Sequence, residues 1–496
     1  MIRKKEHIHP VRKKSTQQPG KKRKKKEKIL PYRPTRANHL FGLFFFLFAW
    51  VLYGNTIATH PATDTLLYPR TDALPVPIRY LFPLEQWAGN WYTPLSHGVN
   101  VLIYGFLSML VFFTLKRLLK DYNILYPFLI ALLFVVHPLH TEVVANLNYR
   151  GELLAFTGGM ACMWLMLNYL ATKMMTRVVA ATALFLTGYL CSPSILVFLL
   201  LFPLVFRFFS NAARKTFLTF YLPLVVVAIA CHFLIRNGLV TLAGSLDFID
   251  NPLFGGNGSE SSFSAGWVTL LFYLRMLFYT FPLLFYYGYD TLPVLHPSGF
   301  RVMLSILIFS ILFFIALSRY RSKGLFSFSI LWFLAAILPY SNFFFPLPGI
   351  VGERYALTAS FGFSMAMITL IFFLVRTDPK SLTIEMDVRL KIFGLLFILL
   401  LPAGIHTLTR NQDWRSQSDL LKSDIPHLEK SVNANTVAGN YYLSVTDTTR
   451  GILYLEKAAW LYPDSAFYMR LSALLESRGE TRRSAYYRDL ARTLHP

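Results

Sequence analysis

The chain has 496 residues, of which 54% are hydrophobic and only 15% are charged, and its formal net charge is +23. A soluble protein of this length carries more charge because its surface must be polar, so the composition excludes that class. It predicts an all-α polytopic membrane protein, with the 45 Phe and 27 Tyr residues at lipid-facing and interfacial positions. The cysteines, Cys162, Cys191 and Cys231, lie in or beside apolar runs, which indicates packing and neither a disulfide framework nor a thiol metal site.

The N-terminal segment, residues 1–39, is the most basic part of the chain. Residues 1–40 hold fifteen Lys and Arg against two Glu, with "KKRKKKEK" at the centre. Because this segment has no apolar face, we expect a disordered tail that the positive-inside rule keeps in the cytoplasm. It lacks the short charged region and small-residue cleavage site of a removable signal peptide. The alternative use of its charge is docking on anionic lipids or on RNA, such as a ribosome at a Sec translocon.

Eleven apolar runs of roughly membrane-spanning length predict eleven transmembrane helices within residues 40–409. Five basic clusters between them, which are "KRLLK", "TKMMTR", "RFFSNAARK", "RYRSK" and "RTDPK", indicate the connections that face the cytoplasm. The runs lie near residues 40–57, 96–115, 123–137, 152–171, 177–191, 193–209, 216–235, 300–318, 325–341, 354–376 and 389–409.

A further apolar run, residues 267–287, does not fit a simple crossing. Arg275 within it makes a lipid-exposed span costly, and a full crossing would place "RYRSK" on the outer side. We therefore expect an interfacial or re-entrant helix on the outer side, with the N-terminus inside and the C-terminus outside. The polar connections, among them an outer loop over residues 58–95, then gather on one face. That pattern favours an enzyme whose site opens to that compartment over a pore.

Residues 410–496 change to a soluble character. The segment 463–496 has an amphipathic helical pattern that breaks at Gly479 and restarts, with apolar residues at tetratricopeptide positions. The stretch before it resembles the second half of another such repeat. Two repeats are too few to form a free-standing solenoid, so we expect this helical domain to pack against the membrane domain.

The stretch "HPLHTEVVANLNYRGE", which begins at His137, carries the most polar motif between apolar runs. Glu142, Asn146 and Arg150 are four residues apart, so a helix through them would present one polar stripe, and His137 and His140 precede it at a turn. Three interpretations stay open. The first is a divalent metal site, for which no third strong ligand is identifiable. The second is an outer-leaflet phosphate site with Arg150 as the clamp and the histidines as donors. The third is a hydrogen-bonded structural turn.

This stretch resembles the signature of polytopic O-mannosyltransferase-like proteins, which join a GT-C glycosyltransferase membrane domain to tetratricopeptide repeats. Three further stretches match that family in chain order, and the resemblance covers residues 40–496. They are "YGNTIATHPATDT", which is similar to the family's first outer loop, "VGERYALTASFGF", similar to the entry of a late span, and "RNQDWRSQSDLL", similar to the link to the repeats. The resemblance, in its bacterial type, implies a GT-C-like bundle of about eleven transmembrane helices with outer-face loops and a short repeat domain.

The resemblance also implies an activity. Such an enzyme moves a sugar, mannose in the named family, from a polyprenyl or dolichyl phosphate donor to a Ser or Thr hydroxyl of an exported polypeptide. A carboxylate must take the hydroxyl proton and cations must surround the departing phosphate. Asp64 stands where the family's first-loop aspartate falls and is the expected base, with Asp72 as a weaker alternative. No metal cofactor is expected.

Five other positions take roles from the same resemblance. Arg354 is expected to reach the donor phosphate with Glu353 orienting it, and the alternative is that the pair anchors a helix end. Asp290, in "YYGYDTLP", is expected to line the sugar or acceptor groove. His97 and Asn100 at the top of the second span are expected to be structural.

The leading hypothesis is thus an inverting or retaining GT-C glycosyltransferase in the bacterial cytoplasmic membrane, with its C-terminal domain in the periplasm; the endoplasmic reticulum is the alternative compartment. A second function is a catalytically degenerate relative that acts as a scaffold in a secretion or translocon complex. Thr65 favours it, because many relatives carry a second aspartate at that position. A transporter is disfavoured, since the spans offer no convincing set of polar residues at mid-bilayer.

Overall fold

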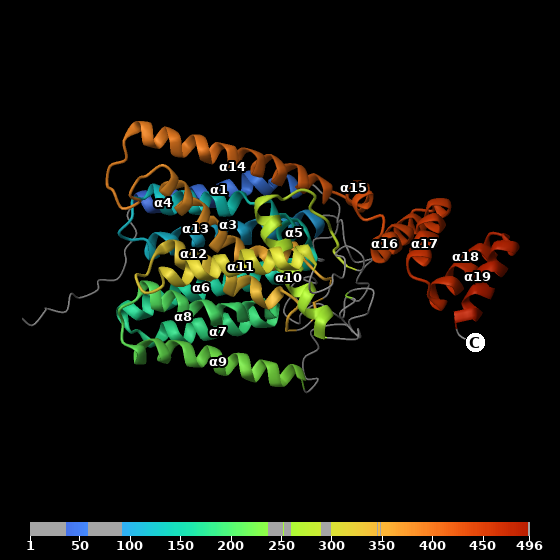
Figure 1. The fold of residues 1–496 in the computed structure, drawn as a ribbon, viewed down its shortest axis with the longest axis horizontal. Coiled ribbons are helices and arrows are strands. Elements are labelled where there is room, and N and C mark those ends of the chain that lie inside the picture. Colours follow the sequence, from blue (N-terminus) through green and yellow to red (C-terminus); the bar gives the residue numbers. More distant parts are fainter. Residues whose placement is uncertain are drawn as a thin grey trace, which may run out of the picture.

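The computed structural model describes residues 36–57, 92–236, 251, 259–288, 299–344, 346–347 and 349–494. Every regular element in these ranges is helical. The elements form a bundle of long, roughly parallel helices, from one end of which a row of shorter helices extends (Figure 1). The expectation of an all-α chain holds for this described part.

The first half of the bundle consists of apolar helices joined by short connections. Several of these helices end at basic or left-handed residues; for example, the helix that ends at Thr172 is followed by Lys173 at a φ of 57°. A left-handed residue after the last turn satisfies helix carbonyls that have no partner in the helix. The helices are α1 (Arg36–Tyr53), α3 (Tyr92–Leu118), α4 (Leu125–Val136), α6 (Arg150–Thr172), α7 (Met175–Cys191), α8 (Val197–Phe209) and α9 (Arg214–Arg236).

The second half adds five helices, of which the last lies along one edge of the bundle in Figure 1. They are α10 (Ser259–Phe278), α11 (Phe300–Ser318), α12 (Leu325–Ile337), α13 (Leu357–Leu374) and α14 (Met386–Asp413). The end of α14 is tied to the end of α1, because the Asn411 side-chain amide donates to the Leu52 carbonyl at 2.8 Å and to the Asn55 side-chain oxygen at 3.0 Å.

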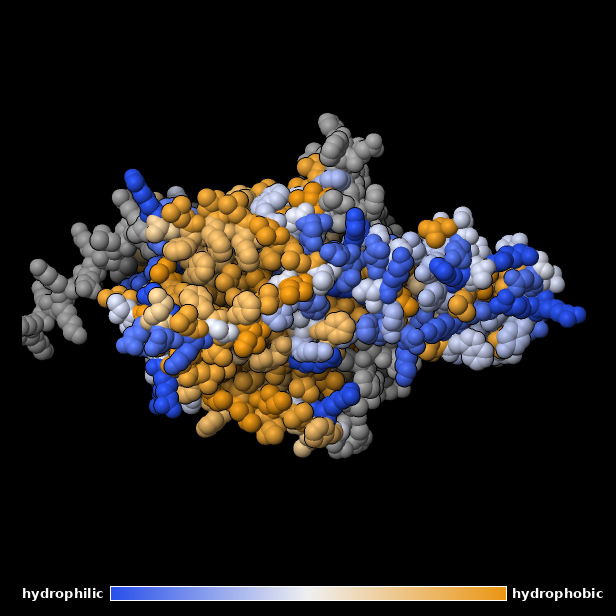
Figure 2. Space-filling model, turned by 90° about the horizontal axis from the view of Figure 1, so that it is seen from above, coloured by the Kyte–Doolittle hydropathy of each residue, from blue (hydrophilic) through white to orange (hydrophobic). Residues whose placement is uncertain are grey.

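Seven helices in the described residues are long and apolar enough to cross a membrane, and the bent pair 125–136 and 138–145 brings the number to eight. Four further apolar helices are shorter. Each of the eleven apolar runs predicted from the sequence contains a helix of the structure, whereas the number of eleven crossings stays a prediction. A broad apolar band covers the bundle and polar residues cover the projecting helices (Figure 2), as expected for a multi-pass membrane protein.

The connections that carry the basic clusters lie together, at the end of the bundle opposite the short helices (Figure 1). The connection after α3 is bonded to the connection after α13, because the backbone N–H of Asn123 donates to the Pro379 carbonyl at 2.9 Å. Lys323, after α11, lies 3.4 Å from the Asn211 side-chain oxygen, after α8. One end of the bundle is therefore strongly basic.

The contacts of α10 place its middle and its C-terminal end near the opposite, non-basic end of the bundle. The Ser305 hydroxyl, in the first turns of α11, donates to the Trp267 carbonyl. At the C-terminal end of α10, the Leu277 carbonyl lies 3.1 Å from the His137 ring, just after α4. These contacts accord with an interfacial segment, and its relation to a bilayer stays a prediction.

The row of short helices contains two antiparallel helix pairs. Side chains of Ser416, Ser431, Asp447 and Asp464 cap the N-termini of the first four helices by accepting backbone N–H bonds. The predicted break at Gly479 is present, with a φ of +76° that glycine adopts without strain. Whether these pairs are tetratricopeptide repeats stays a prediction. The helices are α15 (Gln417–Asp424), α16 (Val432–Ser444), α17 (Thr448–Leu461), α18 (Ser465–Ser477) and α19 (Thr481–Leu494).

Gly362 allows the backbones of α12 and α13 to approach closely. A Cβ at this position would lie 2.8 Å from the Phe333 nitrogen and 2.8 Å from the Ser329 oxygen, which are both backbone atoms. We expect Gly362→Ala to lower the free energy of unfolding by about 1–3 kcal/mol, because the two helices must move apart. In α14, Gly394→Ala is the matched control, since nothing lies within 4 Å of its added Cβ. Thermal unfolding in detergent measures both, and equal midpoints would contradict the prediction.

Candidate functional site

The segment 137–150 is a chain of short turns and not one helix. A 3-10 turn over Pro138–His140 leads into α5 (Thr141–Ala145), and Asn146 then adopts extended backbone with a ψ of 118°. A second 3-10 turn, Leu147–Tyr149, leads into α6. The predicted polar stripe through Glu142, Asn146 and Arg150 is therefore wrong. The reason is local: the Asn146 side-chain oxygen accepts the N–H of Asn148, and such a bond competes with the helical ladder.

Both histidines of the motif are buried and bonded within the protein. The His137 Nε2 atom donates to the Leu277 carbonyl at 3.1 Å, and its Nδ1 atom faces the Leu139 N–H at 3.4 Å. The His140 Nδ1 and Nε2 atoms each lie 2.8 Å from a hydroxyl, those of Tyr104 and Ser360 respectively. This arrangement favours the structural-turn interpretation for the histidines, while their donor-phosphate role stays a prediction.

Glu142 forms a buried ion pair with Arg354, although 212 residues separate them in the chain. The Arg354 guanidinium donates to Glu142 Oε1 at 2.8 Å, and the Arg354 backbone N–H donates to Glu142 Oε2 at 2.5 Å. The guanidinium also lies over the Tyr149 ring at 4.3 Å and the Tyr355 ring at 4.5 Å. The side chains are 9% and 2% exposed for Arg354 and Glu142, so the pair lies in a largely water-free setting.

Glu353 has a different set of contacts from the one expected. The carboxylate bonded to Arg354 is that of Glu142, whereas Glu353 Oε1 accepts the Leu284 N–H at 2.8 Å and the Tyr287 hydroxyl at 2.9 Å. The expectation that Glu353 orients Arg354 therefore needs correction, because adjacent residues of a helical turn point in different directions. Burial, and then the Glu353 charge, raise the pKa of Tyr287, so its phenol stays protonated and donates.

Arg150 is fully buried at the start of α6. Its Nε atom donates to the Asn100 side-chain oxygen at 2.5 Å and its Nη2 atom donates to the Ser96 carbonyl at 2.8 Å, both in α3. Asn100 also donates to the Val144 carbonyl at 3.0 Å, so it links α3 to α5 as a structural residue. Arg150 thus holds α3 and α6 together, and a contact of this arginine with a donor phosphate stays a prediction.

Two buried polar side chains have nitrogen atoms without a hydrogen-bond partner in the described part of the chain. They are both ring nitrogens of His97, which is 1% exposed, and the amide nitrogen of Asn146, which is 0% exposed. Buried polar groups without a bond are rare in folded proteins and often mark functional positions. His97 was expected to be structural, and only its place beside Arg150 in three dimensions singles it out.

A second buried ion pair was missed by the sequence reasoning. Arg410, in the last turn of α14, donates to both Asp424 oxygens, at 2.6 Å and 2.9 Å, and Asp424 ends α15. The Phe285 N–H also donates to Asp424, at 2.7 Å. Arg410 and Asp424 are 2% and 1% exposed as side chains. The pair joins the bundle to the first short helix, and "RNQDWRSQSDLL" contains the arginine without indicating its partner.

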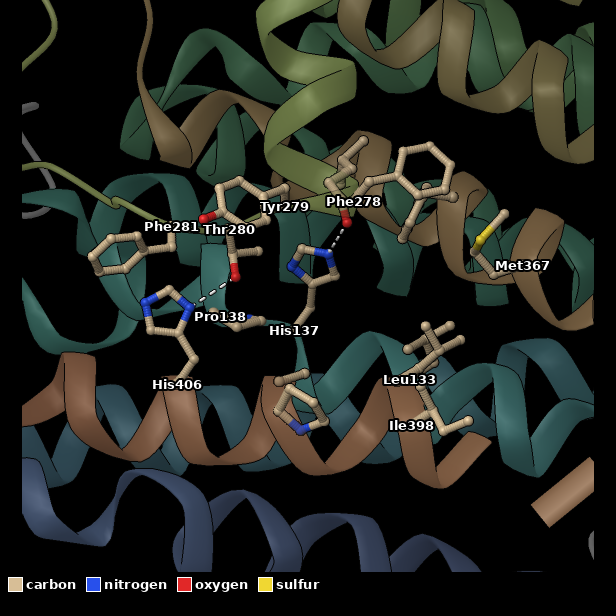
Figure 3. Close-up of a pocket in the computed structure, with 15 residues that line it drawn as sticks. Leu133, His137, Pro138, Phe278, Tyr279, Thr280, Phe281, Met367, Ile398 and His406 are labelled. Atoms are coloured by element: carbon tan, nitrogen blue, oxygen red, sulfur yellow. Dashed lines mark hydrogen bonds between the residues drawn. The ribbon is translucent and has the colours of Figure 1, made fainter. Parts of the chain in front are cut away.

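A cavity of about 310 Å³ lies beside His137, between α4, α13, α14 and the chain that follows α10 (Figure 3). His406 and Thr280 lie at one end, where the Thr280 hydroxyl is 2.8 Å from the His406 Nδ1 atom. Met367 and Ile398 lie toward the other end (Figure 3). The remaining lining is mainly aromatic and aliphatic: Leu133, His137, Pro138, Leu277, Phe278, Tyr279, Phe281, Phe363, Leu399, Pro402 and Ala403.

Two predicted site residues, Asp64 and Asp290, lie outside the described residues, as does Asp72. The convergence of Asp64 with Arg150 and Arg354 therefore stays a prediction. Within the described ranges, no group of three or more His, Cys, Asp or Glu side chains is close enough to hold a metal ion.

The fold and this cluster define a class: a multi-pass helical membrane protein with buried charged groups gathered at one end of its bundle. The chain matches no protein-family model. It is similar to a protein O-mannosyl-transferase of Caenorhabditis elegans, with 24% identity over 338 residues. That match covers 66% of this chain and 45% of the relative, so it spans less than half of the relative's length. This distant similarity supports a glycosyltransferase-like function at the level of a family.

Proposed function

We propose that this protein is a membrane glycosyltransferase of the GT-C type, which moves a sugar from a polyprenyl or dolichyl phosphate to a Ser or Thr hydroxyl of an exported polypeptide. The observation that carries the proposal is the similarity to a protein named as an O-mannosyl-transferase, which includes 66% of this chain. The arginines Arg150 and Arg354 near one end of a membrane bundle support it, because a lipid-linked phosphate is presented at such an end.

In the proposed reaction, the acceptor hydroxyl oxygen forms a bond to the anomeric carbon of the sugar. The bond between that carbon and the phosphate oxygen breaks, and its electron pair leaves with the lipid phosphate. The Asp64 carboxylate takes the hydroxyl proton. Arg354 stabilises the phosphate, and Glu142 fixes the direction of its guanidinium through the bonds at 2.8 Å and 2.5 Å. No metal is part of this proposal.

The orientation in the membrane is also proposed. The basic connections after α3, α6, α8, α11 and α13 would face the cytoplasm with the N-terminal tail, and the short helices would face the other side. The buried charged cluster would then open to the periplasm of a bacterium, or to the lumen in the alternative compartment. A polypeptide leaving a translocon would meet this face first.

The test of the catalytic proposal is Asp64→Asn. We expect the rate of sugar transfer from a polyprenyl phosphate donor to a Ser/Thr-containing peptide to fall by roughly 100-fold or more, because the general base is lost. Asp72→Asn, in the same segment, is the matched control and should retain the wild-type rate. Gel filtration of each purified variant checks that it folds.

The scaffold alternative makes a different prediction. If purified wild-type protein transfers no sugar, and if exported glycoproteins of a deletion strain match those of the parent, the enzyme proposal is wrong. Co-purification of translocon subunits in mild detergent would then support the scaffold function. If Asp72→Asn lowers the transfer rate and Asp64→Asn does not, the protein is still a transferase, and Asp72 is the general base.

A further inference from the structure

The lining of the cavity beside α14 is unsuited to bind water or a polar solute. Three of its polar lining side chains are bonded within the protein: His137 to the Leu277 carbonyl at 3.1 Å, and Thr280 to His406 at 2.8 Å. A buried water needs two to four polar partners, and apolar cavities stay dry. The rest of the lining is aromatic or aliphatic, so the surface suits a hydrocarbon chain.

The cavity opens where the protein meets lipid. Its rim residues Phe278 and Ile398 are 62% and 67% exposed, and α13 and α14, which form two of its walls, are candidate membrane spans. In a bilayer the medium against this flank is acyl chain. From Ile398 to His406 the cavity follows α14 for eight residues, which is about 12 Å at 1.5 Å per residue. This is most of the roughly 15 Å depth of one leaflet of the hydrocarbon core.

A positive charge lies at the polar end of this cavity. Arg275 is exposed, and its guanidinium donates to the carbonyl of the rim residue Phe281 at 3.2 Å. The rings of Phe272 and Tyr279 lie 5.6 Å and 5.7 Å from it. A guanidinium has five N–H donors, so the bond to Phe281 leaves it able to meet a phosphate. Through its bond to Phe281, the arginine belongs to the end of the cavity where Phe281, Thr280 and His406 lie (Figure 3). This end is nearer the short helices, because the nearby Phe285 N–H donates to Asp424.

We propose that this cavity binds an anionic phospholipid from the leaflet nearer the C-terminal helices. One acyl chain lies along α14 between Ile398 and His406, and the phosphate meets Arg275. The lining of this cavity includes His137 but neither Arg150 nor Arg354, and the test of the proposal does not depend on any transferase activity. Bound in this way, the lipid fills the gap between α14 and the rest of the bundle.

The test is lipid retention. Wild-type protein is reconstituted in nanodiscs with equal phosphatidylglycerol and phosphatidylcholine, extracted in mild detergent and examined by native mass spectrometry. We expect one retained phosphatidylglycerol. Ala403→Phe places a ring in the cavity and should abolish retention, whereas Ile405→Phe, on the same helix but outside the lining, should keep it. Met367→Trp fills the cavity from α13 and replaces Ala403→Phe if that variant does not fold.

Arg275→Gln tests the headgroup contact. We expect the preference for phosphatidylglycerol over phosphatidylcholine to fall roughly tenfold, as for loss of one hydrogen bond to a charged group. Arg301→Gln, at another exposed arginine near the start of α11, should leave the preference unchanged. Equal retention in both phenylalanine variants would overturn the proposal. So would a polyprenyl phosphate as the lipid that co-purifies from cells, because the cavity would then hold the proposed sugar donor's chain.

Discussion

Arg354→Ala should lower the free energy of unfolding by about 3–5 kcal/mol, because it leaves the Glu142 carboxylate charged, buried and without its cation. Glu142 is only 1% exposed, so water cannot replace the lost guanidinium without opening the site. The variant also removes the contacts with the Tyr149 and Tyr355 rings. Unfolding in mixed micelles, followed by tryptophan fluorescence, measures the loss.

A double variant separates the buried charge from the rest of the site. Glu142→Gln with Arg354→Met removes both charges, and the glutamine oxygen can still accept the backbone N–H of position 354. We expect this double variant to recover at least half of the lost stability, since replacing both partners of a buried pair is far less costly than removing one. Under the proposed function it would fold and remain inactive. A loss below about 1 kcal/mol for Arg354→Ala, as for an exposed pair, would contradict the burial argument.

Asp424→Ala is expected to cost a similar amount, about 3–5 kcal/mol, at the junction between the bundle and the short helices. The change leaves Arg410 buried without its two-pronged partner and leaves the Phe285 N–H without an acceptor. We expect the short helices to detach from the bundle before the bundle itself unfolds. Limited proteolysis should then cut between α14 and α16 at least ten times faster than in the wild type, because a tenfold change corresponds to a loss of about 1.4 kcal/mol of local stability.

The same short helix offers the control. Asp419 is 42% exposed as a side chain and lies 4.0 Å from Lys422, so Asp419→Ala should change stability by no more than about 0.5 kcal/mol. Equal protection of the junction in Asp424→Ala and Asp419→Ala would show that the buried pair does not hold the short helices in place.

The helices were predictable from the sequence because the apolar composition and the length of each segment are local properties that determine its secondary structure. Each predicted apolar run contains a helix, and the break at Gly479 follows from a residue that tolerates a positive φ. The interior of the motif after His137 was not predictable in the same way. Spacing of four residues suggested a stripe, but Pro138 and the Asn146 side chain interrupt the helix, and short-range bonds of this kind have no periodic signal.

The two buried ion pairs could not be predicted from the sequence for another reason. Glu142 and Arg354 were each predicted as site residues, but nothing in their local sequence pairs them, since they are 212 positions apart. Arg410 and Asp424 are only fourteen positions apart in the sequence, but their contact depends on how α15 folds back against the end of α14. Such partners follow from helix packing, which is decided by side-chain shape over the whole bundle. The placement of Asp64 and Asp290 stays a prediction.

The continuous helix α14, Met386–Asp413, has a mechanical consequence. Its 28 residues span roughly 42 Å at 1.5 Å per residue, which exceeds the roughly 30 Å of a bilayer's hydrocarbon layer. The surplus carries Arg410 and Asn411, which clamp it to α15 and to the end of α1. These two anchors fix the first short helix and the end of α1 to the part of α14 that extends beyond the hydrocarbon layer.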